Sequence, residues 1–227
     1  GGVKRIASVS QIIVPFMAVI YIVFVLVLVV CNITAVPAAF ATIVKAAFSP
    51  KAITGGAVGS FLVAMQKGVA RGIFSNEAGL GSAPIAAAAA KTKEPVRQGL
   101  VSMTGTFIDT IVICTLTAFA VLCAADYIPY GYAEADGMAI CLSAFSKLMG
   151  SGAAGVFLAV SSALFAFSSM ITWAMYGERA LCFLSHDMGQ GIYRICFAVI
   201  CLIGSLSMPG IVWSMGEVFN ALMALPN

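Results

Sequence analysis

The segment GVARGIFSNEAGLGSAP, residues 68–84, interrupts a long apolar run with glycine, serine, asparagine and glutamate. A helix that faces lipid does not tolerate these residues in succession. Because every backbone polar group inside a bilayer needs a hydrogen-bond partner, an unwound stretch survives there only beside protein or a wet cavity. Gly79 and Gly81 lower the steric cost of leaving the helical conformation. The segment therefore predicts a helix over residues 57–90 that is broken near 75–81.

The depth of this break indicates its purpose. Lys91 follows closely, so at a rise of ~1.5 Å per residue the break lies near the middle of the bilayer. Pro84 suits the first turn of a helix that starts again. Transporters use broken helices at this depth to hold an ion or a charged small molecule. The alternative is a glycine hinge or a packing seam, because Ala64, Gly68 and Gly72 form a ridge of small residues.

The composition of the chain places the break in a membrane protein. Of the 227 residues, 61% are hydrophobic and 9% are charged, whereas a soluble domain is about 25% charged. The mean hydropathy is +1.05. So little charge excludes an ordinary cytosolic enzyme, a disordered chain and a nucleic-acid-binding protein. The single histidine excludes a histidine metal cluster, and seven cysteines without a C-x-x-C pair indicate small apolar packing residues.

The apolar segments predict an all-α polytopic membrane protein. The expected membrane spans cover about residues 12–31, 57–90, 98–125, 153–177, 192–208 and 210–225. Two short helices are expected between spans, near residues 37–48 and 138–149. Because the chain begins at Gly1 rather than methionine and ends inside an apolar pattern, we expect one transmembrane transporter domain over residues 1–227 that is incomplete at both ends.

The distribution of lysine and arginine predicts the orientation of these spans. One set of alternate loops carries Lys4, Arg5, Lys91, Lys93, Arg97, Arg179 and Arg194. The opposite loops carry only Lys45, Lys51 and Lys147. Since cytoplasmic loops are enriched in basic residues, the start of the chain is expected in the cytoplasm.

The charged residues expected within the spans include Arg71, Glu77, Asp109 and Glu217. Charge inside a membrane usually faces a cavity or a partner. We interpret these residues as possible coupling or gating charges rather than as direct substrate contacts. The alternative is a structural ion pair, for example between Arg71 and either Asp109 or Glu77.

Hydroxyl side chains follow the span expected at 153–177. Ser161, Ser168 and Thr172 share one helix face, and Ser162, Ser169 and Trp173 share the neighbouring face. Hydroxyl and carbonyl oxygens are hard ligands that suit a small alkali cation. The alternative is that these hydroxyls bond to carbonyls of their own helix or pack against other helices.

With these residues in view, the chain resembles the alanine/glycine:cation symporters, also called sodium:alanine symporters. The resemblance is carried by RGIFSNEAGLGSAP at residues 71–84, FIDT at 107–110 and AFSSMITWAMYGE at 166–178, and it extends over essentially the whole chain. It implies a leucine-transporter-type fold with two inverted five-helix repeats. The expected spans would be helices 5 to 10 of that fold, and the first four helices would be absent.

The resemblance also implies which residues bind substrate and ion. Small amino acids would be contacted by Phe74, Ser75, Asn76, Gly79 and Gly81, with Trp173 and Phe74 limiting the size of the side chain. Sodium would be bound by the hydroxyls of Ser168 and Ser169, completed by carbonyls of the missing first helix.

The function expected from this resemblance is sodium-coupled symport of alanine or glycine into the cell, across a bacterial cytoplasmic membrane. No cofactor other than sodium as the coupling ion, no obligate protein partner and no catalytic activity are expected. A proton-coupled carrier remains an alternative, because Asp109 and Glu77 could titrate. The other alternative is a channel or a structural membrane subunit, although a pore would need a ring of like residues from several subunits.

Overall fold

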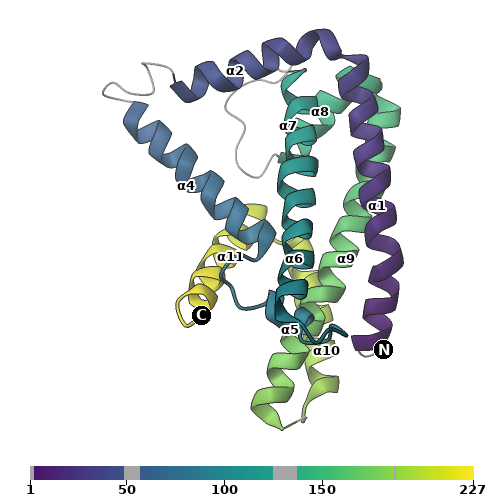
Figure 1. Ribbon diagram of the computed structural model, residues 1–227, viewed down its shortest axis with the longest axis vertical. Coiled ribbons are helices and arrows are strands. Elements are labelled where there is room, and N and C mark those ends of the chain that lie inside the picture. The colour runs from purple at the N-terminus through teal and green to yellow at the C-terminus, as the bar shows by residue number, and fades with distance from the viewer. Residues whose placement is uncertain (1–2, 49–56, 125–136, 187) are drawn as a thin grey trace. The chain divides into compact units, whose positions relative to one another are not determined.

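The computed structural model describes residues 3–48, 57–124, 137–186 and 188–227, which form helices joined by turns (Figure 1). No strand occurs among these residues, so the all-helical prediction is confirmed for the part of the chain described. Lys51, expected in a loop, lies outside it. The chain divides into two compact units: Gly1–Val19 with Gly79–Gln98 and Ala159–Asn227, and Ile20–Ala78 with Gly99–Leu158. The helices α1 (Val3–Cys31), α6 (Pro95–Thr106) and α9 (Ser151–Ser185) contribute residues to both units.

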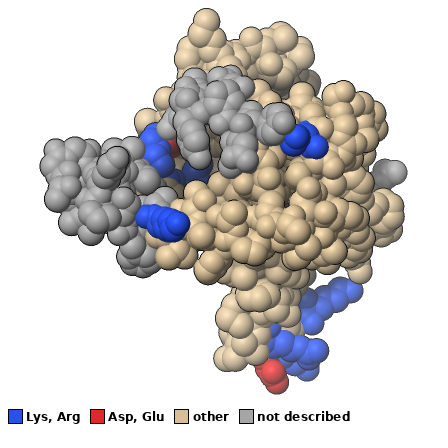
Figure 2. All heavy atoms as spheres, turned by 90° about the horizontal axis from the view of Figure 1, so that it is seen from above, with Lys and Arg blue, Asp and Glu red and all other residues tan. Residues whose placement is uncertain are grey.

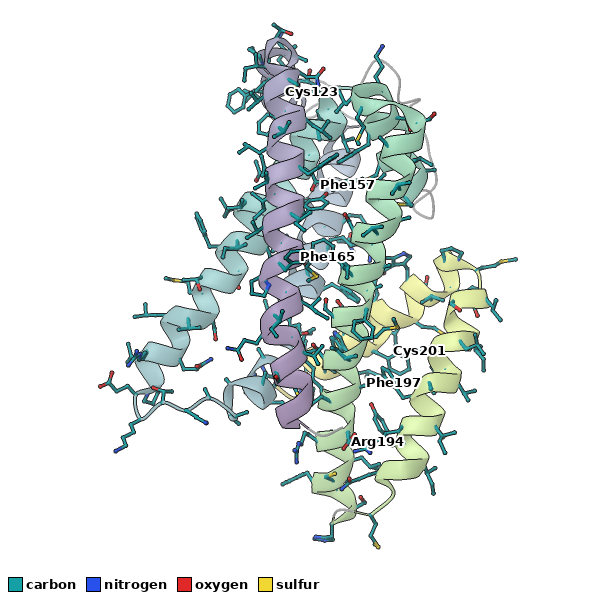
Figure 3. The ribbon with its side chains drawn as sticks, turned by 90° about the vertical axis from the view of Figure 1, so that its right-hand side faces the viewer. Cys123, Phe157, Phe165, Arg194, Phe197 and Cys201 are labelled. Carbon is teal, nitrogen blue, oxygen red and sulfur yellow. The ribbon has the colours of Figure 1, made fainter. Side chains whose placement is uncertain are left out.

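The unit formed by Ile20–Ala78 and Gly99–Leu158 has an aromatic core. The ring of Phe157 on α9 stacks on Phe24 of α1, with centroids 3.9 Å apart, and Figure 3 shows it between the two helices. Phe145 and Tyr21 stack on the same ring at 6.0 and 5.8 Å. The Tyr21 hydroxyl lies 2.8 Å from that of Thr117. These contacts join four elements, because Phe145 belongs to α8 (Gly137–Met149) and Thr117 to α7 (Thr115–Leu122).

One of the remaining helical segments of this unit has π-helical rather than α-helical geometry. The helix α6 (Pro95–Thr106) continues into a π-helical segment, η2 (Phe107–Cys114), and then into α7. The helix α4 (Ala57–Asn76) contacts η2, and α2 (Val36–Phe48) contacts α7. The short helices expected near 37–48 and 138–149 correspond to α2 and α8.

The other unit is organised around the second part of α9. There α10 (Gln190–Leu206) runs beside α9, and Figure 3 shows Arg194 and Phe197 on the side of α10 that faces it. Arg194 forms a bidentate ion pair with Glu178, at 2.7 and 2.9 Å. The unit also contains α5 (Ala83–Ala87) and α11 (Pro209–Ala224). The sequence predicted a span that ends near 177, but α9 continues to Ser185, because residues 178–181 (ERAL) are good helix formers.

The surface of the described helices is apolar. Three segments are long and apolar enough to cross a membrane, namely Ser8–Cys31, Pro95–Leu122 and Ser151–Ser185, and α10 is a shorter apolar helix of 17 residues. Large side chains such as Val160 (55%) and Ile200 (66%) are well exposed. Charged side chains are sparse on the face drawn in Figure 2. This exposed apolar surface needs lipid around it, and the chain is a multi-pass membrane protein.

Candidate functional site

The interruption that follows α4 is built from left-handed backbone. The helix ends at Asn76, turns and a bend occupy 77–82, and α5 begins at Ala83. Gly79 (φ 74°) and Gly81 (φ 76°) take conformations that favour glycine, and so does Glu77 (φ 51°), which has no such freedom. The sequence placed the break near residues 75–81 and the helix end near 90. The second helix has only five residues, so it is shorter than expected.

The last two residues of α4 are joined to η2 by side-chain hydrogen bonds. Ser75 Oγ donates to Asp109 Oδ2 at 2.6 Å. Asn76 Nδ2 donates to Thr110 Oγ1 at 2.8 Å, and Thr110 Oγ1 lies 3.1 Å from Asn76 Oδ1. Asn76 Nδ2 also donates to the carbonyl of Gly72 at 3.0 Å. The polar end of α4 is thus held by consecutive residues of the π-helical segment.

Asp109 therefore has a different partner from the one considered in the sequence. The sequence alternative paired it with Arg71, whereas in the structure its carboxylate accepts a hydrogen bond from the hydroxyl of Ser75. Arg71, Glu77 and Asp109 are all half-buried, and so is Glu217 on α11. Within the described residues no group of three histidine, cysteine or acidic side chains could hold a metal ion.

A cavity lies in the unit that contains α5 and the second part of α9. Its volume is about 420 Å³. It is lined by Leu80, Gly81, Ser82, Ile85, Trp173, Tyr176, Gly177, Ala180, Tyr193, Phe197 and Met223. The lining is mostly aromatic and aliphatic with a few polar groups, which is the usual character of a small-molecule pocket. The cavity brings together two predicted residues, Gly81 and Trp173.

The aromatic wall of the cavity comes from α9 and α10. Trp173 meets Tyr176 edge to face, with ring centroids 5.8 Å apart and planes at 72°. Gly177 follows directly, and a Cβ atom at this position would overlap the hydroxyl of Tyr193. A glycine is therefore required for the close approach of the Tyr193 ring to α9. Tyr193 and Phe197, four residues apart on α10, face the same cavity.

The glycines of the break have a polar neighbour. The side-chain amide of Asn227 donates to the carbonyl of Gly79 at 3.0 Å. A Cβ atom at Gly81 would lie 3.0 Å from Asn227 Oδ1, closer than ordinary van der Waals contact. Gly81 is therefore favoured by its positive φ, whereas the side chain of Asn227 could move to admit a Cβ atom.

The two serines predicted to bind sodium have different environments. Ser168 is 8% exposed, and its hydroxyl donates to the carbonyl of Phe165 at 2.9 Å. Its oxygen lies 3.9 Å from the sulfur of Met17 on α1. Thr172 donates to the carbonyl of Ser168 at 2.8 Å, whereas Ser169 is exposed. The back-bonding alternative thus holds for Ser168 and Thr172, whose hydroxyl hydrogens are donated to carbonyls of α9. The oxygen lone pairs of both hydroxyls remain able to coordinate a cation.

The predicted residues therefore fall into two groups. Ser75 and Asn76 lie with Asp109 in one unit, where Phe74 is 36% exposed at the end of α4. Gly79, Gly81, Trp173, Ser168 and Ser169 belong to the other unit.

Several residues of the cavity, and Thr110 beside Asn76, escaped the sequence analysis. Tyr176 and Gly177 stand within the motif AFSSMITWAMYGE, and Thr110 within FIDT, so these motifs could have identified them. Tyr193 and Phe197 carry only the signal of two aromatic residues spaced by four on an apolar helix. That signal is equally typical of lipid-facing residues, because spacing alone does not show what a helix face meets.

Comparisons with known proteins agree with the motifs. The model of the sodium:alanine symporter family matches residues 1–227. The chain is 43% identical to the sodium/alanine symporter AgcS of Methanococcus maripaludis, covering 100% of this chain and 49% of the relative. It is 44% identical to the amino-acid carrier protein AlsT of Bacillus subtilis, covering 100% of this chain and 47% of the relative. It is 42% identical to the probable sodium/glutamine symporter GlnT of the same bacterium, covering 100% of this chain and 46% of the relative. The chain thus spans about half the length of these relatives.

Proposed function

This chain belongs to the sodium:alanine symporter family, and we propose that it takes part in sodium-coupled uptake of a small neutral amino acid, alanine or glycine. The membrane is proposed to be the cytoplasmic membrane of a bacterium. The helices α1, α4 with α5, α6 to α7, α9, α10 and α11 would be helices 5 to 10 of a leucine-transporter-type fold. Sodium and the amino acid are the proposed ligands, and no protein partner is included.

The observation that carries this proposal is the cavity in which Gly81 and Ser82 of the interrupted helix meet Trp173 of α9. A buried amino acid needs partners for its carboxylate and its ammonium group. The turns at 77–82 can offer backbone N–H and C=O groups that a continuous helix would use internally. Trp173 and Tyr176 add a bulky wall, which favours a small side chain. In the proposal Phe74, Ser75, Asn76 and Gly79 complete the binding site.

Sodium is proposed to bind beside α9. The hydroxyl oxygens of Ser168 and Ser169 are hard ligands, and backbone carbonyls would complete the shell. A sodium ion that moves inward gains ~2.3 kcal/mol per 100 mV of membrane potential, in addition to its concentration gradient. This energy drives uptake only if ion and amino acid each bind more tightly to the state that the other favours.

The proposal is tested by uptake of labelled alanine and glycine into proteoliposomes that contain the complete gene product. Concentrative uptake that requires an inward sodium gradient is expected. Uptake that follows a proton gradient and ignores sodium would replace sodium by the proton. Equilibration without accumulation would indicate a channel instead.

A pair of tryptophan variants tests, in the same assay, whether Trp173 belongs to the proposed site. Trp173→Ala removes a wall of the cavity, so uptake of alanine is expected to fall while larger neutral amino acids compete better. Trp213→Ala on α11 is the matched control, because Trp213 does not line this cavity. Equal effects of the two variants would remove Trp173 from the proposed site.

A further inference from the structure

The cavity beside α9 is larger than the proposed amino acid requires. Its volume of about 420 Å³ falls within the range of about 300–1,000 Å³ that is typical of pockets for drug-sized ligands. Alanine and glycine are far smaller than such ligands. If the ligand is this small, a wall in addition to Trp173 must prevent longer side chains from entering the remaining space.

The remaining space extends along α9 toward its C-terminal end. Trp173, Gly177 and Ala180 all line the cavity, and their spacing places them on one face of the helix. At a rise of ~1.5 Å per residue, this face covers about 10 Å from Trp173 to Ala180. Gly177 has no side chain and Ala180 has only a methyl group. Beyond Trp173, the width of the cavity is therefore decided by the facing helix, α10.

Tyr193 is the side chain of α10 that approaches α9 at this point. A Cβ atom at Gly177 would overlap the Tyr193 hydroxyl and would lie 2.8 Å from its Cζ atom. The edge of the ring therefore rests on the backbone of α9, one helical turn beyond Trp173. Phe197 packs against this ring, with centroids 6.0 Å apart, and Figure 3 shows Phe197 on the side of α10 that faces α9. Tyr193 thus narrows the cavity next to Trp173.

An ion pair joins the two helices at the adjacent positions. Glu178 follows Gly177 on α9, and Arg194 follows Tyr193 on α10. The carboxylate accepts two hydrogen bonds from the guanidinium, at 2.7 and 2.9 Å, and a bidentate pair of this kind fixes the geometry of both partners. Because the side chain of Arg194 is 50% exposed, the pair adds little to stability. Its effect is to set the position of α10 against α9, and with it the place of the Tyr193 ring.

We propose that Tyr193 is a specificity-determining residue, whose ring excludes neutral amino acids with side chains longer than that of alanine. Glu178 and Arg194 are positioning residues, which keep this ring against Gly177. The rings of Trp173 and Tyr193 bound the ligand from α9 and α10, respectively. The inference rests on the proposed function in taking a small neutral amino acid as the ligand, and it adds to the binding site a helix on which the sequence predicted no site residue.

The test is displacement of labelled alanine from the purified complete gene product, with sodium present, by glycine, alanine, 2-aminobutyrate and norvaline. These ligands differ only in the length of an unbranched side chain, and the affinity of wild type is expected to fall steeply beyond alanine. Tyr193→Ala is expected to raise the affinity for norvaline relative to alanine at least about tenfold, since one methylene group changes selectivity by about 10–200-fold. Ile195→Ala is the matched control, because Ile195 is 68% exposed on α10 and does not line the cavity.

Two further variants keep the test decisive if Tyr193→Ala does not fold. Tyr193→Leu removes the far part of the ring and is expected to shift the affinities toward norvaline. Tyr193→Phe retains the ring and is expected to keep the wild-type order of affinities.

Glu178→Gln tests the positioning role. It is expected to raise the relative affinity for norvaline by less than Tyr193→Ala does, and to add nothing when the two are combined, because both act through one ring. Arg194→Lys keeps the charge without the bidentate geometry, so it is expected to act in the same direction. A merely structural role of the ion pair would lower the affinity for all four ligands alike, and that result would overturn the positioning role.

Several results would overturn the role of Tyr193. They are an affinity of wild type for norvaline equal to that for alanine, an unchanged order of affinities in Tyr193→Ala or Tyr193→Leu, and an equal shift in Ile195→Ala. In each case alanine would still bind, so the proposed function would stand. Wild type that binds neither alanine nor glycine would refute the proposed function, and this inference with it.

Discussion

Gly177 shows how one missing methyl group shapes the cavity. A Cβ atom at this position would overlap the hydroxyl of Tyr193, so Gly177→Ala must displace the ring or α10. We expect this variant to lose about 1–3 kcal/mol of stability, as in other overpacked sites, and to lose uptake. Thermal unfolding in detergent and alanine uptake are the measurements.

Two controls define this effect. Gly191→Ala on α10 has no atom within 4 Å of its new Cβ, so it is expected to be neutral or slightly stabilising. Adding Tyr193→Phe to Gly177→Ala removes the overlapping hydroxyl and is expected to restore part of the loss. A Gly177→Ala variant as stable as wild type would contradict the close contact.

Glu77 is a second residue whose backbone decides the effect of substitution. Its φ of 51° lies in the left-handed region, where a β-branched residue is strongly disfavoured. We expect Glu77→Val to cost about 1–2 kcal/mol more than Glu77→Gly, which suits this conformation. Comparing the thermal stability of the two variants separates backbone strain from loss of the charge, because both lack the carboxylate.

For single residues, the sequence indicated which positions are unusual better than it indicated which side chains contact each other. Gly79 and Gly81 have the positive φ that their type and context indicated. Glu77 has it too, which its residue type does not indicate. The partner of Asp109 was also missed, since the hydroxyl of Ser75 was assigned to substrate and Arg71 was considered as the counter-ion. A single sequence does not show which faces of two helices meet.

Among the elements, the aromatic stack on Phe157 holds α1, α8 and α9 together. Its ring contacts Phe24 at 3.9 Å and Phe145 at 6.0 Å. We expect Phe157→Ala to lower the stability by about 3 kcal/mol, as measured by thermal unfolding in detergent. Phe167→Ala is the control on the same helix, since Phe167 is 45% exposed and should cost much less. Equal losses of stability in the two variants would show that the aromatic stack stabilises the protein no more than an exposed phenylalanine does.

The existence of the helices could be predicted from the sequence, because long apolar runs leave few alternatives in a membrane. Their internal irregularities could not. The segment Phe107–Cys114 is as apolar as α7 and contains no glycine or proline, so nothing in its composition indicated a π-helical turn. The short length of α5 was missed for a related reason: residues 85–90 are one isoleucine and five alanines, which suit a longer helix than the structure has.

For the whole molecule, the charge distribution predicts a defined orientation in the membrane. We expect a cysteine placed at Met188, between α9 and α10, to react with a membrane-impermeant reagent only after the cells are permeabilised. A cysteine placed at Lys147 on α8 should react in intact cells. Both positions are exposed, and the native cysteines would be replaced first. The opposite pattern would invert the orientation proposed here.

The family was identified from three motifs, and the family model confirmed it over residues 1–227. The membrane character followed from composition, and the exposed apolar helices agree with it. The substrate, the coupling ion and the site residues cannot be predicted from motifs and composition in the same way. They depend on which side chains converge around a ligand, and neither apolar periodicity nor charge counting carries that information.

The π-helical segment also limits how the sequence can change in length during evolution. A π-helical turn holds more residues than an α-helical one, so deleting one residue within Phe107–Cys114 would let the helix close into regular α geometry. The deletion would rotate Asp109 and Thr110 relative to α7. Homologues with a one-residue gap here should therefore have lost the acid and the hydroxyl together, whereas point substitutions would remove them one at a time.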